Sequence, residues 1–283
     1  MTTRMLLVAV AASCAAGAAQ ADCATDEAVA AFVASFEART PAVALGADGD
    51  MEDALCTQGK LAAALEPIVG PVVGYKAGLT SAPAQERFGV DAPLRGLLFR
   101  DMMLEDGATV PAAFGAVPLF EADLVLVVAD AAINDATDPV GVMEHVSAVR
   151  PFIELPDLML AEGEPLTGET ITAMAVGPRL GVLGAEIPVD DPAAMAEALG
   201  AMTVTLSAAD GSTLAEAPGA AVLGHPANAV LFLRDAGVTL APGDLVSVGS
   251  FGPLVPPAKA GGAATLRYAG LPGDPSVTVN FSQ

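Results

Sequence analysis

The sequence predicts an α+β fold, in which a helical N-terminal part precedes a largely antiparallel or mixed sheet with helices on its outside. Three observations predict it. Apolar residues recur at three- and four-residue spacing from residue 22 to about 68. From residue 69 on, short runs of β-forming residues alternate with Gly- and Pro-rich turns. No internal repeat or long linker interrupts this second part, so we expect one domain over 69–283.

The first 21 residues have the order of a secretory signal peptide. Arg4 is followed by an apolar run and by Ala19-Gln20-Ala21, which predicts cleavage before Asp22 and a periplasmic or secreted protein. A short first helix is one alternative. Lipoprotein processing at Cys14 is another, but the position three before that cysteine is Ala where such sites favour Leu.

Signal removal leaves two cysteines, Cys23 and Cys56. Two thiols in an oxidising compartment usually bridge, and this bridge would tie the mature N-terminus to the first helical part. Two unpaired thiols are the alternative. No later run approaches the roughly 18 consecutive apolar residues that span a bilayer, so we expect no membrane insertion after signal removal.

The net charge is −22, and loss of Arg4 with the signal makes it −23 (11 basic against 34 acidic residues). Such a field repels nucleic acid and anionic membrane surfaces, so neither is expected as a partner. It also repels a small anionic substrate, unless a cation in the site reverses the local potential.

Periodicity and turn residues predict the remaining elements. The residues after Phe120 form a strong strand, and Asp210-Gly211 predicts a hairpin turn within residues 201–217. Amphipathic patterns with polar or Pro starts predict helices. The further strands expected are 244–250, 264–270 and 276–282, and the helices are 139–150, 191–202 and 225–238.

Two carboxylates, Glu121 and Asp123, stand at the start of the strong strand. Side chains alternate along a strand, so residues two apart converge on one volume. Two acids in a site of low dielectric repel, and one protonates unless a cation neutralises them. A hard divalent cation such as Mg²⁺ or Mn²⁺ is the usual solution. A solvated strand edge is the alternative.

A third acid, Glu154, lies in the Pro-bracketed segment PFIELPDL and would complete a set of three oxygen ligands. Lys76 lies in the Gly-rich segment GYKAGLTS. A partly buried lysine near a metal can act as acid or base. A surface lysine whose stem covers apolar atoms is the alternative.

The two histidines are weaker candidates for functional residues than the acids and Lys76. His145 is expected on the surface or near a cap of the predicted 139–150 helix, and His225 is expected to have a structural role at a helix start. The GGAAT segment lacks the Lys of a phosphate loop. Neither a Gly-x-Ser-x-Gly elbow nor a Cys-x-x-Cys pair is present.

The segments GYKAGLTS, FGVDAPLRGLLFRDMM, PLFEADLVLVV, PFIELPD, VLGHPANAVLFL and APGDLVSVGSFGPLVPPAKAGG follow one another in this order. In order and spacing the chain resembles the 2-keto-4-pentenoate hydratases, with their 4-oxalocrotonate decarboxylase relatives, of the fumarylacetoacetate hydrolase superfamily. The resemblance covers about Val72 to Phe281. It implies a fumarylacetoacetate hydrolase-like mixed β-roll with flanking helices, and a homo-oligomer.

The resemblance also implies a site. The family's metal-binding Glu-x-Glu falls on Glu121 and Asp123, its third carboxylate on Glu154, its lysine on Lys76, and a hydroxyl near the substrate on Ser250. Mg²⁺ or Mn²⁺ would chelate a small anionic 2-keto acid and stabilise its enolate as a Lewis acid. Lys76 would move a proton during ketonisation, and water would then add across the distal double bond.

Three departures from the family stand out. Asp123 replaces the usual Glu and is one methylene shorter, so a metal must shift or a water must intervene. Ala173-Met174-Ala175 replaces a segment like Ala-Asp-Asn, which removes polar groups from the pocket. Relatives are mostly cytoplasmic catabolic enzymes, whereas this chain carries an export signal.

Three functions compete. The first is a metal-dependent hydro-lyase (hydratase) acting on a small 2-keto acid such as 2-keto-4-pentenoate, carried by the three acids and Lys76. The second is a superfamily relative that decarboxylates a 2-keto diacid or hydrolyses a C–C bond. Hydrolases use an additional His, and none lies upstream of Glu121 in the matching region. The third is a non-catalytic exported binding protein on the same fold, favoured by the export signal and the altered 173–175 segment.

Overall fold

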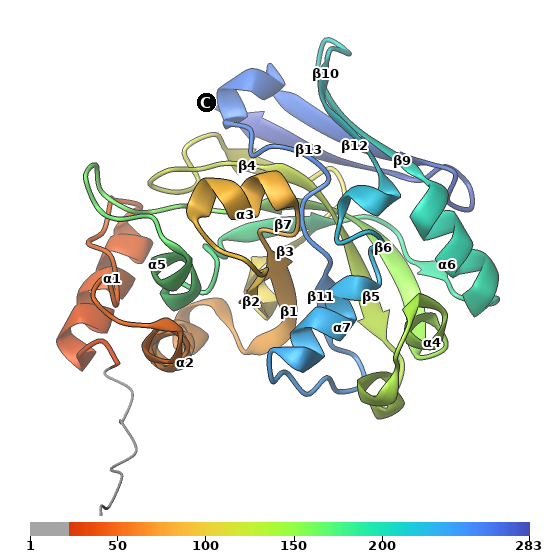
Figure 1. The fold of residues 1–283 in the computed structure, drawn as a ribbon. Coiled ribbons are helices and arrows are strands. Elements are labelled where there is room, and N and C mark those ends of the chain that lie inside the picture. Colours follow the sequence, from red (N-terminus) through yellow and green to blue (C-terminus); the bar gives the residue numbers. More distant parts are fainter. Residues whose placement is uncertain (1–22) are drawn as a thin grey trace, which may run out of the picture.

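The computed structural model describes residues 23–283 (Figure 1). The predicted signal peptide, Cys14 and the cleavage site before Asp22 lie outside the described residues. The described part contains these α-helices: α1 Asp26–Ala38, α2 Met51–Val69, α3 Ala82–Phe88, α4 Pro139–Met143, α5 Gly168–Ala173, α6 Pro192–Ala201 and α7 Asn228–Asp235. None of the helices within 23–283 has the length and apolar character that crossing a membrane requires.

The N-terminal helices α1 and α2 form one end of the molecule and pack beside α5 (Figure 1). The Thr25 hydroxyl caps α1 by accepting from the Ala28 N–H. Asp50 caps α2 in a capping box with Asp53. Their apolar faces share a core with α5 and with Leu94, Leu97 and Phe99 of the main sheet. The predicted helical segment thus appears as two capped helices over 26–69.

A disulfide joins Cys23 to Cys56, with 5.4 Å between their Cα atoms. It fixes the start of the described chain on α2. Two further contacts lie beside it: the Ala24 N–H donates to the Thr57 hydroxyl at 2.9 Å, and Lys60 Nζ donates to the Ala24 carbonyl at 3.0 Å. The N-terminal segment is therefore held covalently and by hydrogen bonds.

Replacing both cysteines by serine should lower the free energy of unfolding by about 4 kcal/mol, because a bridge closing a loop of this length restricts the unfolded chain. Denaturant titration of the oxidised wild type and the double variant measures the loss. Wild type with reductant is the matched control and should show the same midpoint as the variant. Equal midpoints for oxidised and reduced wild type would contradict the expectation.

The first sheet carries the strands that position the candidate site. Its order is β2-β1-β11-β5-β6-β7-β3, and β8 also pairs with β6. The short strand β11 pairs parallel with β1 and antiparallel with β5, so it lies between them. The strands are β1 Val72–Gly78, β2 Leu94–Phe99, β3 Met103–Glu105, β5 Glu121–Val128, β6 Val146–Leu155, β7 Leu180–Leu183, β8 Ile187–Pro188 and β11 Leu245–Ser247.

The second sheet has the order β10-β9-β12-β13-β4 and packs against β5 and β6 of the first. Strands β9 and β10 form the predicted hairpin, with Gly211 at φ +83° in its turn. Sequence patterns had also indicated the positions of β11, β12 and β13. The strands are β4 Thr109–Pro111, β9 Thr203–Ala208, β10 Thr213–Pro218, β12 Ala263–Ala269 and β13 Ser276–Ser282.

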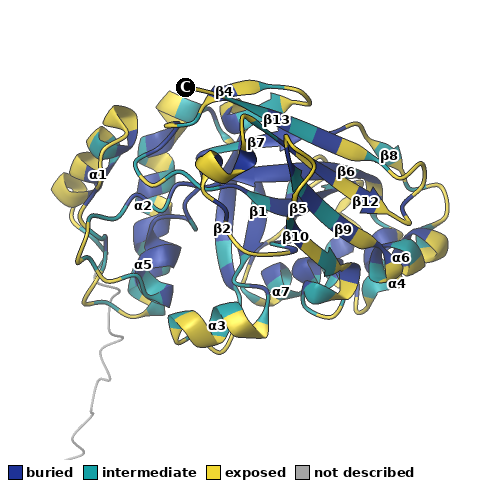
Figure 2. Ribbon diagram, turned by 90° about the horizontal axis from the view of Figure 1, so that it is seen from above, coloured by how far each residue is buried: buried dark blue, intermediate teal, exposed yellow. Residues whose placement is uncertain are grey.

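The predicted helix over 139–150 is wrong beyond Met143. The chain turns there, and β6 begins at Val146 as a central strand paired with β5 and β7. Burial between two neighbouring strands overrides the local helical pattern. Helices α6 and α7 confirm the other two predictions, whereas α3 and α5 were not predicted. Figure 2 shows the strands of the first sheet largely buried and α3 on the outside; no residue of α3 is buried.

Candidate active site

The three predicted acids lie on one face of the first sheet. Glu121 on β5 is the register partner of Glu154 on β6, so their side chains leave the sheet on the same side. Asp123 lies two residues further along β5 and shares that face. Asp123 is 0% exposed and Glu154 4%, while Glu121 is half-buried. The strand pairing therefore brings together acids that lie 33 residues apart in sequence (121 to 154).

Lys76 reaches the same acids from β1. It is the register partner of Ser247 on β11, and Ser247 is the partner of Val125 on β5, which places Lys76 on the face of the acids. The residue is 2% exposed and its ammonium forms an ion pair with Glu154. Among the cations of residues 23–283, Lys76 alone forms an ion pair with one of the three acids.

The Asp123 carboxylate is held by three donors. Oδ2 accepts from the Ser247 hydroxyl. Oδ1 accepts from the Gly249 N–H at 2.9 Å and from the Leu124 N–H at 2.6 Å. Gly249 has φ +102°, and a Cβ there would lie 2.7 Å from a backbone oxygen of β1, so this turn requires glycine. The turn after β11 is thus shaped to bind a carboxylate.

Ser250 follows in the same turn and lies beside Glu121. A hydrogen bond from its side chain is among the influences that lower the pKa of Glu121. The Ser250 hydroxyl also donates to the Gly252 carbonyl at 2.6 Å. The structure therefore brings Ser250 beside Glu121, one of the three acids.

Burial and mutual repulsion shift the acids toward their neutral forms. Burial raises the pKa of Glu121 well above its usual value, and Glu154 and Asp123 raise it further while Lys76 lowers it. Burial and Glu154 raise the pKa of Asp123 to about 7, although its hydrogen bonds lower it in part. One ammonium among three carboxylates leaves an excess of negative charge that is costly at this burial.

Without metal, the protein should lose stability as the pH rises from about 4 through about 7. The folded chain keeps the Asp123 proton up to a pKa of about 7, whereas the unfolded chain releases it near 3.8. This contribution, on the order of 4 kcal/mol, is complete in acid and gone at alkaline pH. Thermal midpoints in EDTA between pH 5 and 8 measure the slope. Asp123→Asn should flatten it, and an unchanged slope in that variant would contradict the assignment.

The donor chemistry of the cluster fits a hard divalent cation. Carboxylate oxygens are the ligands that Mg²⁺ and Mn²⁺ prefer, and a double positive charge would offset the excess negative charge. As the side chains lie, however, no three acidic, histidine or cysteine groups within residues 23–283 are arranged to hold a metal. Asp123 is turned to its three donors and Glu154 to Lys76. Binding therefore requires that these contacts open or that water intervenes.

No protein-family profile matches the chain. Among curated proteins, the 2-keto-4-pentenoate hydratase of Paraburkholderia phymatum is 33% identical over 220 residues, which cover 75% of this chain and 79% of the relative. The 2-keto-4-pentenoate hydratase of Burkholderia vietnamiensis is 33% identical over 205 residues, covering 71% and 75%. The chain belongs to the 2-keto-4-pentenoate hydratase family. The predicted family is therefore confirmed.

Solved structures give the same fold for this hydratase-family chain. The 4-oxalocrotonate decarboxylase of Pseudomonas putida G7, complexed with magnesium and adipate, aligns with a TM-score of 0.76 at 22% identity, covering 91% of this chain and 97% of that one. The fumarylpyruvate hydrolase of Pseudomonas aeruginosa, in complex with Mn²⁺ and pyruvate, aligns at 0.53 and 16% identity, covering 75% and 90%. The predicted α+β, fumarylacetoacetate hydrolase-like fold is confirmed.

The segment that departs from the hydratase family, Ala173-Met174-Ala175, is buried in the core shared by α1, α2 and α5. The next residue, Val176, lies beside Lys76 instead. A Cβ on Gly96 would lie 2.8 Å from Lys76 Cγ and 2.9 Å from Val176 Cβ. Val176 has φ +61°, a strained conformation for a β-branched residue. Sequence reasoning missed Val176 because only the folded turn brings it to the lysine.

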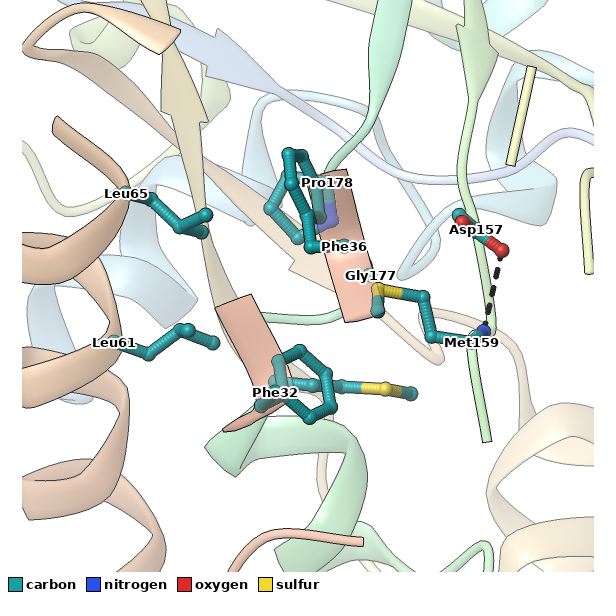
Figure 3. A pocket seen from close by; sticks show the side chains of 9 residues that line it. Phe32, Phe36, Leu61, Leu65, Asp157, Met159, Gly177 and Pro178 are labelled. Carbon is teal, nitrogen blue, oxygen red and sulfur yellow. Dashed lines mark hydrogen bonds between the residues drawn. The ribbon is translucent and has the colours of Figure 1, made fainter. Parts of the chain in front are cut away.

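Two hollows lie away from the acids. The first, of about 10 Å³, has room for one water and is lined by side chains of α1 and α2 together with Asp157, Met159 and Met174 (Figure 3). The second, of about 470 Å³, lies at the edge strand β2 and includes Arg95. Arg95 pairs with Ala77 and so leaves β2 on the side opposite Gly96 and Lys76. Neither hollow is lined by the acids or Lys76.

The histidines lie outside the acid cluster. His145 Nδ1 is 3.0 Å from a carboxylate oxygen of Asp130 on the outside of the molecule. His225 contacts the Ala196 carbonyl through Nε2 at 2.8 Å and accepts the Ala227 N–H through Nδ1 at 3.1 Å. His225 therefore ties α6 to the start of α7. Neither histidine contacts the acids or Lys76 through a hydrogen bond or ion pair within residues 23–283.

Proposed function

We propose that the protein is a divalent-metal-dependent hydro-lyase that adds water to a small 2-keto acid such as 2-keto-4-pentenoate, supplied as 2-hydroxypenta-2,4-dienoate. The buried group of Glu121, Asp123, Glu154 and Lys76 on one sheet face carries the proposal. Curated relatives named 2-keto-4-pentenoate hydratase support it. A purely structural role does not explain three acids gathered around one ammonium.

Glu121, Asp123 and Glu154 would hold the ion, which we propose to be Mg²⁺ or Mn²⁺. When bound, the ion supplies Lewis-acid stabilisation for negative charge that develops on the 2-keto oxygen. The carboxylates lie on β5 and β6, which pair along the whole length of β5, so they are held on a rigid support. The ion also offsets the repulsion between this acidic chain and an anionic substrate.

Lys76 is the proton carrier of the proposed reaction. Its ammonium lies against Glu154 in a buried position, and we propose that it donates a proton to the substrate carbon and takes one back. Val176 and Gly96 lie against the lysine stem. Ser250 offers a hydroxyl next to Glu121 for a polar group of the substrate.

The test is a spectrophotometric assay with enzymatically generated 2-hydroxypenta-2,4-dienoate. Loss of the dienol absorbance should require Mn²⁺ or Mg²⁺, stop with EDTA, and yield the hydrated 2-keto acid without release of CO₂. Release of CO₂ from a 2-keto diacid, with no hydration, would assign the decarboxylase alternative. Metal binding without either reaction would leave a non-catalytic binding protein.

We infer that the mature chain is exported and begins at Asp22. The disulfide between Cys23 and Cys56 supports this, since structural disulfides are typical of oxidising compartments. Cell fractionation with N-terminal sequencing tests it, and an uncleaved cytoplasmic chain would refute it. We also infer a homo-oligomer, which light scattering of the purified protein tests; a monomeric mass would refute it.

A further inference from the structure

One buried tyrosine connects the second sheet to the strands that carry the acids. Tyr268 lies on β12 and is 0% exposed. Its hydroxyl donates to the Asp123 carbonyl and accepts the Phe152 N–H at 3.1 Å. Asp123 and Phe152 are register partners on β5 and β6. One hydroxyl therefore binds both members of a single cross-strand pair.

The hydroxyl approaches from the side opposite the acids. Tyr268 belongs to the main core together with Ala122 and Leu124, whose side chains leave β5 on the face away from Asp123. The next pair on the acid face is Glu121 with Glu154. Tyr268 thus cannot touch a bound ion, and it acts on the backbone that carries the ligands.

Packing alone does not require the hydroxyl. The core around Tyr268 is apolar, and a phenylalanine would fill nearly the same space. A buried hydroxyl costs free energy unless its hydrogen bonds are made, and here all of its bonds go to the acid-bearing strands. Burial raises the pKa of Tyr268 well above its usual value, so the hydroxyl stays protonated and can both donate and accept.

We propose that Tyr268 is a positioning residue, whose hydroxyl fixes the backbones of Asp123 and Phe152 and thereby the spacing between the carboxylates of β5 and that of Glu154. The inference rests on the proposed function in so far as those carboxylates bind a divalent cation. Outer groups that orient metal ligands typically change metal affinity by about 10- to 100-fold.

The test is Tyr268→Phe, with Leu266→Val as the matched control on the same face of β12, where Leu266 is also buried. Mn²⁺ affinity, measured by calorimetry, should fall about 10- to 100-fold in Tyr268→Phe and stay within about twofold in the control. Both variants lose some thermal stability. Unchanged affinity in Tyr268→Phe, or an equal loss in both variants, would overturn the proposal.

A second readout does not depend on metal. Hydrogen exchange of the Phe152 amide in the metal-free protein should quicken in Tyr268→Phe relative to Leu266→Val, because that amide loses its acceptor. If the wild type binds no Mn²⁺, the proposed function fails, and this exchange still decides whether the hydroxyl holds the strand pair. Equal exchange in the two variants would overturn the positioning role.

Discussion

Glu154→Gln should abolish tight metal binding and lower turnover by at least about a thousandfold. The change keeps the size of the side chain but removes one of three carboxylates from the cluster. It also deprives the buried Lys76 ammonium of its ion-pair partner. Since Glu154 raises the pKa of both Glu121 and Asp123, the two remaining acids should ionise at lower pH. Mn²⁺ calorimetry and the dienol assay measure the two losses.

The matched control for this variant is Glu162→Gln, an exposed acid in the loop between β6 and α5, which changes the net charge equally. It should bind Mn²⁺ and turn over as the wild type does. Retained turnover in Glu154→Gln would show that the reaction does not use this carboxylate. A large loss in both variants would point to the overall charge instead.

Lys76→Met should lower turnover by about 10² to 10⁴, the range for removing a general acid or base, while Mn²⁺ binding is kept. Methionine fills most of the volume of the buried stem but offers no proton. Loss of the ammonium also frees Glu154 from its ion pair, so the metal affinity should stay the same or rise. Single-turnover assays at saturating Mn²⁺ separate the chemical step from metal loading.

Lys60→Met is the control for Lys76→Met. Lys60 pairs with Asp26 at 2.9 Å near the N-terminus, and its side chain is 38% exposed. Its removal should leave turnover unchanged. If Lys76→Met turned over normally, another group would have to carry the proton. If it lost Mn²⁺ binding as well, the lysine would serve to organise the acids.

The sequence alone predicted how the two acids on β5 are arranged, but it did not predict which residues surround them. Alternation along a strand predicted that Glu121 and Asp123 share a face. That Glu154 lies opposite Glu121 depends on the register of β5 and β6, and spacing along the chain does not determine register. The family resemblance placed Glu154, Lys76 and Ser250 in one site, and the structure brings them together.

The roles of other residues could be recognised only from tertiary contacts. Ser247 and Ser250 stand in one segment, and only the pairing of β11 shows that Ser247 holds Asp123. Tyr268 is an ordinary aromatic of a strand pattern until the second sheet stacks on β5 and β6. The helix expected over 139–150 failed for a related reason, because β6 is stabilised by two neighbouring strands that local periodicity does not reveal.

The place of β11 has a consequence for how the chain reaches its native state. Because β11 lies between β1 and β5, those early strands gain their shared neighbour only after residue 247 has left the ribosome. Pairings this distant in sequence slow folding. Until then β1 and β5 keep open edges, which favour association with other chains. Lys76 and Glu154 therefore come together late in folding. A partly folded chain would have neither their ion pair nor a place to bind a metal ion.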